Sequence, residues 1–160
     1  MHAELLTIGS ELTSGVTVNS NAAYLARRLA EAGIVCSRQV AVGDERAALR
    51  EAIREALGRC GLLVMTGGLG PTFDDVTLET LAEATGRPLT FHPEIAARIR
   101  RFYTRLGRRL QRAAMRQAYV PRGATPLPNP IGTAPGVWLS LPAPSRLRFA
   151  KQSVRGQAGL

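Results

Sequence analysis

Short apolar runs alternate with amphipathic segments along the first half of the chain. Residues 3–9 form an apolar run that ends in glycine, and residues 19–33 place Tyr24, Leu25 and Leu29 at helical spacing. The same alternation predicts strands over residues 35–44 and 62–66 and helices over residues 45–58 and 76–86. Strands that alternate with helices favour an α/β fold in which helices cover both faces of a mostly parallel sheet.

The second half of the chain begins with a longer predicted helix and then loses its periodicity. Residues 93–110 place Ile95, Ile99 and Phe102 on one face and arginines on the other, as in an amphipathic helix. After Val120 the sequence is rich in proline and glycine, and residues 137–141 form one further strand-length run. We therefore expect irregular chain between the long helix and a last strand.

The length of 160 residues allows one domain with a substantial core. We expect this domain to span residues 1–141. From Pro142 onward the sequence is basic and has no readable period. We interpret residues 142–160 as a divergent tail, and its abrupt loss of pattern is consistent with a truncated domain.

The net charge of +9 is distributed unevenly along the chain. Residues 1–94 hold 8 arginines and all 12 acidic residues, so the remaining 13 basic residues leave residues 95–160 strongly positive. A basic half can bind nucleic acid or another polyanion. However, 20 of the 21 basic residues are arginine, which indicates a general compositional bias. We therefore favour a solvated arginine-rich helix face and do not expect a nucleic-acid partner.

The two cysteines, Cys36 and Cys60, show no metal-ligand or redox-motif spacing. Each lies beside a predicted strand, so we expect buried free thiols, as in a reducing compartment. The N-terminus has no basic segment followed by an apolar one, and no apolar run approaches membrane-spanning length. These features predict a cytoplasmic protein without a membrane partner.

The segment "MTGGLGPTFDDVT", residues 65–77, joins a predicted buried strand to a helix. Glycines at this position let backbone N–H groups approach a ligand, and a helix start favours an anion such as phosphate. The carboxylates of Asp74 and Asp75 would repel a phosphate unless a divalent cation lay between them. The alternative is that one of the two aspartates is the N-cap of the helix over residues 76–86. Capping alone does not account for the glycines.

Two other predicted strand ends carry similar groups. Glu11, Asn19 and Asn21 follow the first strand, and Asp44 follows the second. Each has a structural alternative, because Asn19 with Ser20, and Asp44, stand where helix N-caps are expected. Ligands of parallel α/β sheets bind beyond the carboxyl ends of the strands, so three successive loops of this kind favour a shared site.

Four segments together resemble one family: "GSELTSGVTVNSNAAYLARRLAEAGI", "VGDE", "TGGLGPTFDDVTLE" and "RQAYVPRGATPLPNPIGTAPG". In order and spacing they are similar to the N-terminal molybdopterin-binding domain of CinA-like, competence-damage inducible proteins, which is related to MogA and MoaB. The resemblance covers about residues 1–141. It implies a three-layer α/β/α sandwich and a homo-oligomer. It also implies molybdopterin or another small phosphate-bearing molecule as ligand.

The resemblance implies roles for individual residues. Asp44 and Asp75 would be catalytic, and Asp44, Asp74 and Asp75 would hold Mg²⁺ or a similar cation. Ligand or phosphate binding is implied for Gly9, Glu11, Asn19, Asn21, Gly67, Gly68, Gly70, Thr72, Asn129, Gly132 and Thr133.

The activity implied first is metal-dependent hydrolysis of a nucleotide diphosphate such as ADP-ribose. The alternatives are a non-catalytic molybdopterin- or nucleotide-binding module and a molybdopterin adenylyltransferase-like activity. The nicotinamide mononucleotide deamidase domain that often follows in CinA-like proteins is absent from this sequence, so that activity is not expected of it.

Overall fold

The computed structural model describes residues 2–142, and its central feature is a parallel sheet of three strands in the order β2-β1-β3. Its elements are β1 (His2–Ile8), α1 (Ser10–Thr13), α2 (Ser20–Glu31), β2 (Val35–Val42), α3 (Arg46–Leu57), β3 (Leu62–Thr66), α4 (Thr77–Thr85), β4 (Leu89–Phe91), α5 (Pro93–Arg105), the 3₁₀ helix η1 (Arg112–Ala118), β5 (Tyr119–Pro121), β6 (Thr125–Leu127) and β7 (Gly136–Trp138). The predicted α/β fold with a parallel sheet is confirmed, and the predicted tail over residues 142–160 lies almost wholly outside the described residues.

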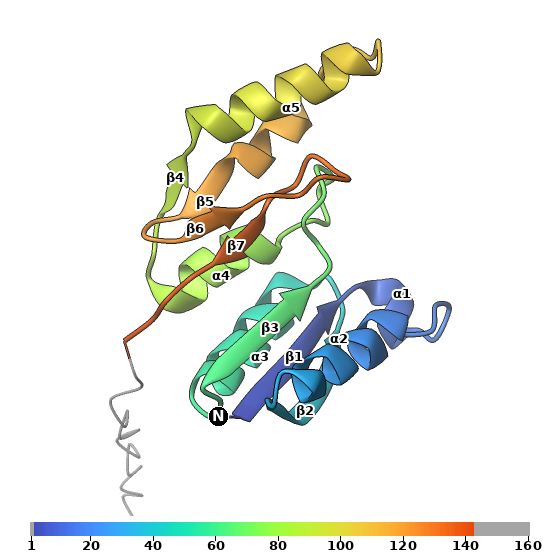
Figure 1. Cartoon of the computed structure of the whole chain (residues 1–160), viewed down its shortest axis with the longest axis vertical. Helices are drawn as coiled ribbons and strands as arrows, with labels where there is room; N and C mark the ends of the chain where they lie inside the picture. The colour runs from blue at the N-terminus through green and yellow to red at the C-terminus, as the bar shows by residue number, and fades with distance from the viewer. Residues whose placement is uncertain (1, 143–160) are drawn as a thin grey trace, which may run out of the picture.

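β1 is the central strand, and residues 3–8 are buried on both faces. On one face, Leu6 and Ile8 pack against Leu49 and Ile53 of α3. On the other face, Thr7 accepts a hydrogen bond from the residue that precedes α2. Figure 1 shows α2 and α3 on opposite sides of the sheet, so this part of the molecule has three layers.

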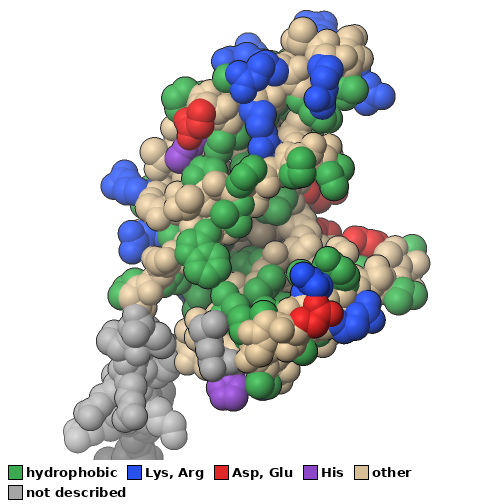
Figure 2. All heavy atoms as spheres, viewed as in Figure 1, with side chains coloured by type: hydrophobic (Ala, Val, Ile, Leu, Met, Phe, Trp, Pro, Cys, Tyr) green, Lys and Arg blue, Asp and Glu red, His purple; other side chains and the backbone are tan. Residues whose placement is uncertain are grey.

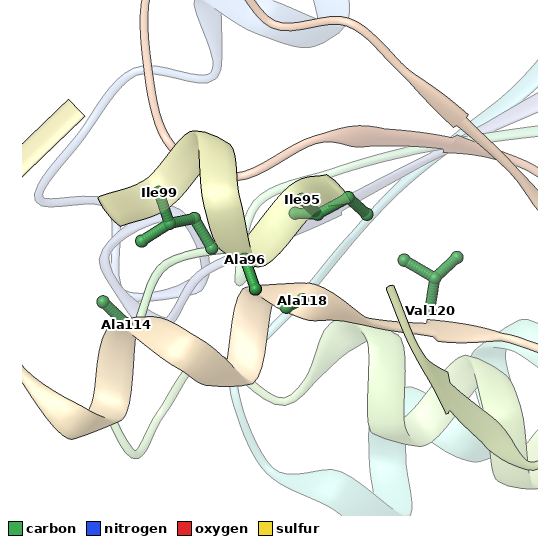
Figure 3. Packing of buried hydrophobic residues seen from close by; sticks show 6 residues of the cluster. All are labelled: Ile95, Ala96, Ile99, Ala114, Ala118 and Val120. Carbon is green, nitrogen blue, oxygen red and sulfur yellow. The ribbon is translucent and has the colours of Figure 1, made fainter. Parts of the chain in front are cut away.

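The rest of the described chain forms a second group of elements, in the upper part of Figure 1. There β4 pairs with β5 and β6 pairs with β7, both antiparallel. Figure 3 shows its core, in which α5 packs on η1 and β5. The buried residues of this core are Ile95, Ala96, Ile99, Ala114, Ala118 and Val120. Because Ala96 of α5 and Ala114 and Ala118 of η1 have small side chains, these two helices can approach each other closely.

Helix α4 links the two groups of elements. Leu81 and Ala84 of α4 pack against the core formed by β1 and α3. Glu83 of α4 also forms an ion pair with Arg46 of α3. Arg116 of η1 pairs with Glu79 of the same helix at 2.8 Å. Contacts of α4 with both sides therefore hold the sheet and the second group together.

Several predicted boundaries differ from the structure. α5 ends at Arg105 rather than at residue 110, because Gly107 adopts a left-handed conformation with φ of 62°, a common helix terminator. The last strand covers Gly136–Trp138 rather than residues 137–141. The elements α1, η1, β4, β5 and β6 were not predicted.

The surface and the cysteines agree in part with the sequence. Figure 2 shows Lys and Arg side chains gathered at the end of the molecule where Figure 1 places α5.

Cys36 and Cys60 are free thiols but are half-buried rather than fully buried. Burial raises the pKa of the Cys60 thiol. Within residues 2–142, every helix falls short of the length and apolar character needed to cross a membrane.

Candidate functional site

The loops that follow β1 and β2 are joined by Asp44. Its carboxylate accepts hydrogen bonds from the backbone N–H and the hydroxyl of Ser10, at 2.9 and 2.7 Å. Gly9 adds a backbone bond from its N–H to the carbonyl of Val42 at 2.9 Å. The ends of two neighbouring strands therefore form one connected surface.

Asp44 is not the N-cap of α3, so that alternative is wrong. The cap is Glu45, whose carboxylate accepts from the backbone N–H groups of Ala48 at 2.7 Å and Ala47 at 3.0 Å. These two bonds hold the pKa of Glu45 below its ordinary value. One oxygen of Asp44 takes both bonds from Ser10, and the other makes no hydrogen bond within the described residues.

The first loop divides into structural and exposed positions. Asn19 caps α2 by accepting from the N–H of Ala22 at 3.1 Å, and its amide donates to the Thr7 hydroxyl at 2.8 Å. The predicted cap is confirmed at Asn19, and both ends of that side chain are occupied. Asn21 and Glu11 are exposed. Of the predicted first-loop ligands, these two have side chains free to contact a bound molecule.

The loop after β3 packs directly against the end of β1. Gly67 has φ of 105°, and a Cβ there would lie 1.9 Å from the carbonyl oxygen of Ile8. Gly68 has φ of 58°, and its Cβ would lie 2.4 Å from the Thr77 hydroxyl oxygen. Only glycine fits at these two positions. The close approach brings the third loop to the same sheet edge as the first two.

Asp75 shapes the third loop and does not cap α4. One carboxylate oxygen accepts from the N–H of Gly70 at 2.8 Å, and the other accepts from the N–H and hydroxyl of Thr72. The residue before α4 is Val76, and no side chain caps this helix. The prediction that one of the paired aspartates is the cap is therefore wrong. Asp74 is exposed and makes no hydrogen bond or ion pair within the described chain.

Two adjacent residues of η1 hold the third loop from the other side. Arg116 donates to the carbonyls of Thr72 at 2.8 Å and Asp75 at 3.3 Å, and Gln117 donates to the carbonyl of Leu69 at 3.1 Å. These side chains and the loop line a small pocket of about 20 Å³, with room for about one water molecule. Its walls are Gly68, Leu69, Gly70, Asp75, Leu78, Glu79, Leu89, Arg116, Gln117 and Tyr119.

Arg116 and Gln117 were missed as site residues. The signal was available, because both belong to the segment "RQAYVP" that supports the family resemblance. Nothing local in that segment indicates which loop it contacts, since the partners lie more than 40 residues earlier in the chain.

The loop with Asn129 is ordered by its own contacts. The Asn129 side chain accepts from the N–H groups of Ile131 and Gly132 and donates to the carbonyl of Ala134. Arg98 of α5 donates to the carbonyls of Gly132 and Thr133, both at 3.3 Å. Among the described residues, no hydrogen bond connects this loop to the other three. The predicted ligand positions Asn129, Gly132 and Thr133 are therefore held by contacts within their own loop and with α5.

The predicted metal ligands do not form a complete cation site. Residues 2–142 contain no group of three or more His, Cys, Asp and Glu side chains arranged to hold a metal ion. Both oxygens of Asp75 are engaged with loop donors. A cation at this edge would need oxygen atoms from a bound phosphate, which is a common arrangement for Mg²⁺.

Comparison with known proteins identifies close sequence relatives. A CinA-like protein of Parasynechococcus marenigrum is 48% identical over 147 residues, which are 91% of this chain and 35% of the relative. A CinA-like protein of a Cyanothece species is 47% identical over 148 residues, 92% of this chain and 35% of the relative. The chain thus spans about a third of the length of these relatives.

Solved structures show the same fold. The crystal structure of the protein CinA from Thermoplasma acidophilum, described as having unknown function, matches with a TM-score of 0.79 and 36% identity, over 86% of this chain and 80% of that one. A molybdopterin biosynthesis protein from Mycobacterium abscessus matches with a TM-score of 0.51 and 26% identity, over 77% of this chain and 72% of that one. Residues 4–149 match the family model described as "Probable molybdopterin binding domain". The chain therefore belongs to the molybdopterin-binding domain family and is one of its CinA-like members.

Proposed function

We propose that this domain binds a small phosphate-bearing ligand, of the molybdopterin or nucleotide diphosphate class, where the loops after β1, β2 and β3 meet. The observation that carries the proposal is the junction of these loops. Asp44 ties the second loop to Ser10, and Gly67 packs against Ile8 at the end of the first strand. The family description and the likeness to a molybdopterin biosynthesis protein support the same ligand class.

Two features of this edge suit a phosphate group. The first turn of α4 has no side-chain cap. The N–H of Thr77 donates to the carbonyl of Gly68 at 3.2 Å, whereas the N–H groups of Leu78 and Glu79 make no hydrogen bond within the described residues and lie at the positive end of the helix dipole. Gly67, Gly68 and Gly70 let the loop fold closely against Ile8, Thr77 and Asp75, which brings its backbone to this edge. Backbone donors of this kind recognise phosphate irrespective of the group attached to it.

The carboxylates at the edge favour joint binding of the ligand with a divalent cation. Asp74 is exposed, and one oxygen of Asp44 is without a hydrogen bond in the described structure. A cation held between these acids and a diphosphate would offset their repulsion. When bound, it would polarise the phosphoryl oxygens and favour attack by water.

Metal-dependent hydrolysis of ADP-ribose is therefore the second candidate function. The observation that supports it is the negative charge of the acids beside the proposed phosphate position. Asp44, Asp74 and Asp75 are its candidate residues, and Asp75 contributes mainly by holding the loop in shape.

The experiment is a calorimetric titration with ADP-ribose and with pyrophosphate, each with and without Mg²⁺, together with chromatography of the products. We expect both ligands to bind more tightly with Mg²⁺, and the Asp74→Asn variant to lose this metal dependence. Glu31→Gln, at an exposed acid distant from the loops, is the matched control. Mg²⁺-dependent binding without hydrolysis products would support the proposed binding function and refute the proposed hydrolase activity. No binding of either ligand would refute both.

A further inference from the structure

A cavity lies between α3 and the parallel sheet. Its volume is about 140 Å³, close to that of an engineered protein cavity that binds benzene. Side chains of both layers form its apolar walls: Leu6, Val40, Leu63, Ala52 and Ala56. Because the two alanines of α3 have small side chains, they leave space between this helix and the sheet.

Charged side chains lie beside these apolar walls. The Glu4 carboxylate is 4% exposed and accepts hydrogen bonds from Nε and Nη2 of Arg59 at 3.1 and 3.0 Å. Arg38, Glu55 and Arg59 also line the cavity and are exposed. A small molecule could therefore enter between these three side chains, place apolar atoms against the walls and keep a polar group near the solvent.

The two arginines have N–H groups that can bind such a polar group. Arg59 uses three of its five N–H groups to donate to Glu4 and Glu55. The guanidinium of Arg38 makes no hydrogen bond or ion pair within residues 2–142. Because Arg59 already offsets the charge of Glu4, the guanidinium of Arg38 can pair with an anion from outside. A carboxylate matches the geometry of guanidinium donors.

We propose that this cavity is a second ligand site, which binds a small carboxylate whose apolar part is about the size of a benzene ring. The apolar part lies between α3 and the sheet, and the carboxylate accepts from Arg38 and from the remaining N–H groups of Arg59. Glu4 lies near the start of β1, and Arg59 precedes β3. The cavity is therefore remote from the loops that follow these strands, and the inference is independent of the proposed function.

The first arm of the test is an NMR titration of the whole chain with benzoate, benzamide and acetate. Benzamide has the shape of benzoate without its charge, and acetate has the charge without the ring. We expect benzoate to bind with a Kd of about 1 mM or below and to shift the amide signals of Leu6, Ala52 and Leu63. Benzamide and acetate should each bind about 10-fold more weakly.

The second arm changes the cavity. Arg38→Gln should weaken benzoate binding about 10-fold and leave benzamide binding unchanged. Arg27→Gln, at an exposed arginine of α2 on the opposite side of the sheet, is the matched control and should change neither. Ala52→Leu fills the cavity and should abolish benzoate binding. Circular dichroism establishes that each variant is folded, and if Ala52→Leu is not, the wild-type chain and Arg38→Gln decide.

Three results would overturn the proposal. Benzoate-induced shifts confined to the loops after β1, β2 and β3 would show that the anion binds elsewhere. Equal binding of benzoate and benzamide would refute a carboxylate as the recognised group. No shift with any of the three probes would assign the cavity to ordered water and leave the proposed function, which is tested with ADP-ribose and pyrophosphate, unaffected.

Discussion

The carboxylate of Asp44 and the backbone and hydroxyl of Ser10 form a paired contact between two strand ends 34 residues apart in sequence. The backbone N–H of Asp44 in turn donates a hydrogen bond to the Ser10 hydroxyl oxygen at 3.2 Å. Three hydrogen bonds between two residues keep the first two loops in a defined relative position. A ligand that contacts both loops would then meet a preorganised surface and lose less affinity to ordering.

Asp44→Asn should separate the structural role of this residue from its charge. The amide oxygen of asparagine can still accept from Ser10, so we expect the unfolding free energy to stay within about 0.5 kcal/mol of the parent. Asp44→Ala loses both acceptor bonds and should cost about 1–2 kcal/mol. Both variants should weaken Mg²⁺-dependent ADP-ribose binding. Urea unfolding and calorimetry check this, and full Mg²⁺ dependence in Asp44→Asn would show that Asp44 does not approach the cation.

Asp75 and Asp74 should respond differently to the same change. In Asp75→Asn, an amide N–H₂ must face either the Gly70 N–H or the Thr72 N–H, so a donor meets a donor. We expect a loss of about 1–3 kcal/mol in stability. Asp74→Asn should leave stability unchanged and reduce metal-dependent binding. Thermal unfolding and calorimetry on both variants test this pair, and an unaltered stability of Asp75→Asn would contradict the loop-shaping role.

Arg116 should stabilise the third loop from outside it. Arg116→Met removes bonds to Glu79 and to the carbonyls of Thr72 and Asp75. Because the Arg116 and Glu79 side chains are 35% and 26% exposed, we expect a cost of about 1–2 kcal/mol rather than the value for a fully buried pair. Amide exchange over residues 67–77 should become faster. Arg112→Met, at an exposed arginine of the same helix, is the control and should change neither quantity.

The sequence predicted the elements that have a long or strongly periodic pattern. The runs at β1 and β3 are apolar because these strands contribute side chains to the core, and α3 shows its buried face as Leu49 and Ile53. The strands β4, β5 and β6 are three residues each, too short for a period to be visible. The segment of η1 continues the composition of α5, so only Gly107 indicates that the helix has ended.

The sequence predicted which loops lie at the sheet edge, but it did not predict the hydrogen-bond partners of their side chains. The loops around Asp44, Gly67 and Asp75 follow strand ends, and the rule for parallel sheets places them at one edge. Which donor each carboxylate accepts from depends on the loop conformation, so both helix-cap interpretations failed. Gln117 could not be assigned, because its contact with Leu69 joins segments 48 residues apart.

Glu4 should make the stability of the fold depend on pH at the acidic end. Hydrogen bonds from Arg59 hold the pKa of the buried Glu4 carboxyl below its ordinary value of 4.5, although burial opposes them. Because the folded-state pKa lies below the unfolded-state value, the stabilisation is complete above about pH 4.5 and is lost as pH falls through the folded-state pKa.

Glu4→Gln should therefore destabilise the protein at pH 7 by about 1–3 kcal/mol and flatten the decline between pH 5 and pH 3. Glu55 is exposed and is the other acid that pairs with Arg59. Glu55→Gln should lower the free energy of unfolding by less than about 0.5 kcal/mol. Urea unfolding at a series of pH values measures both. An equally steep acid decline in Glu4→Gln would assign it to other carboxyls.

The basic face of α5 should bind DNA weakly and without sequence preference. Arg100, Arg101 and Arg105 are exposed on this helix, whereas the aromatic residues between them, Phe102 and Tyr103, are half-buried and pack on each other, so they present little free surface for stacking on bases. Attraction of such a face to phosphates arises from counterion release, so affinity should fall steeply between 50 and 200 mM salt. Fluorescence anisotropy with two unrelated duplexes should give equal affinities.

Replacing the three arginines by glutamine should weaken that binding and leave ADP-ribose binding unchanged, because the loops after β1, β2 and β3 carry none of these side chains. Tight binding to one duplex at 150 mM salt would instead identify α5 as a specific nucleic-acid surface.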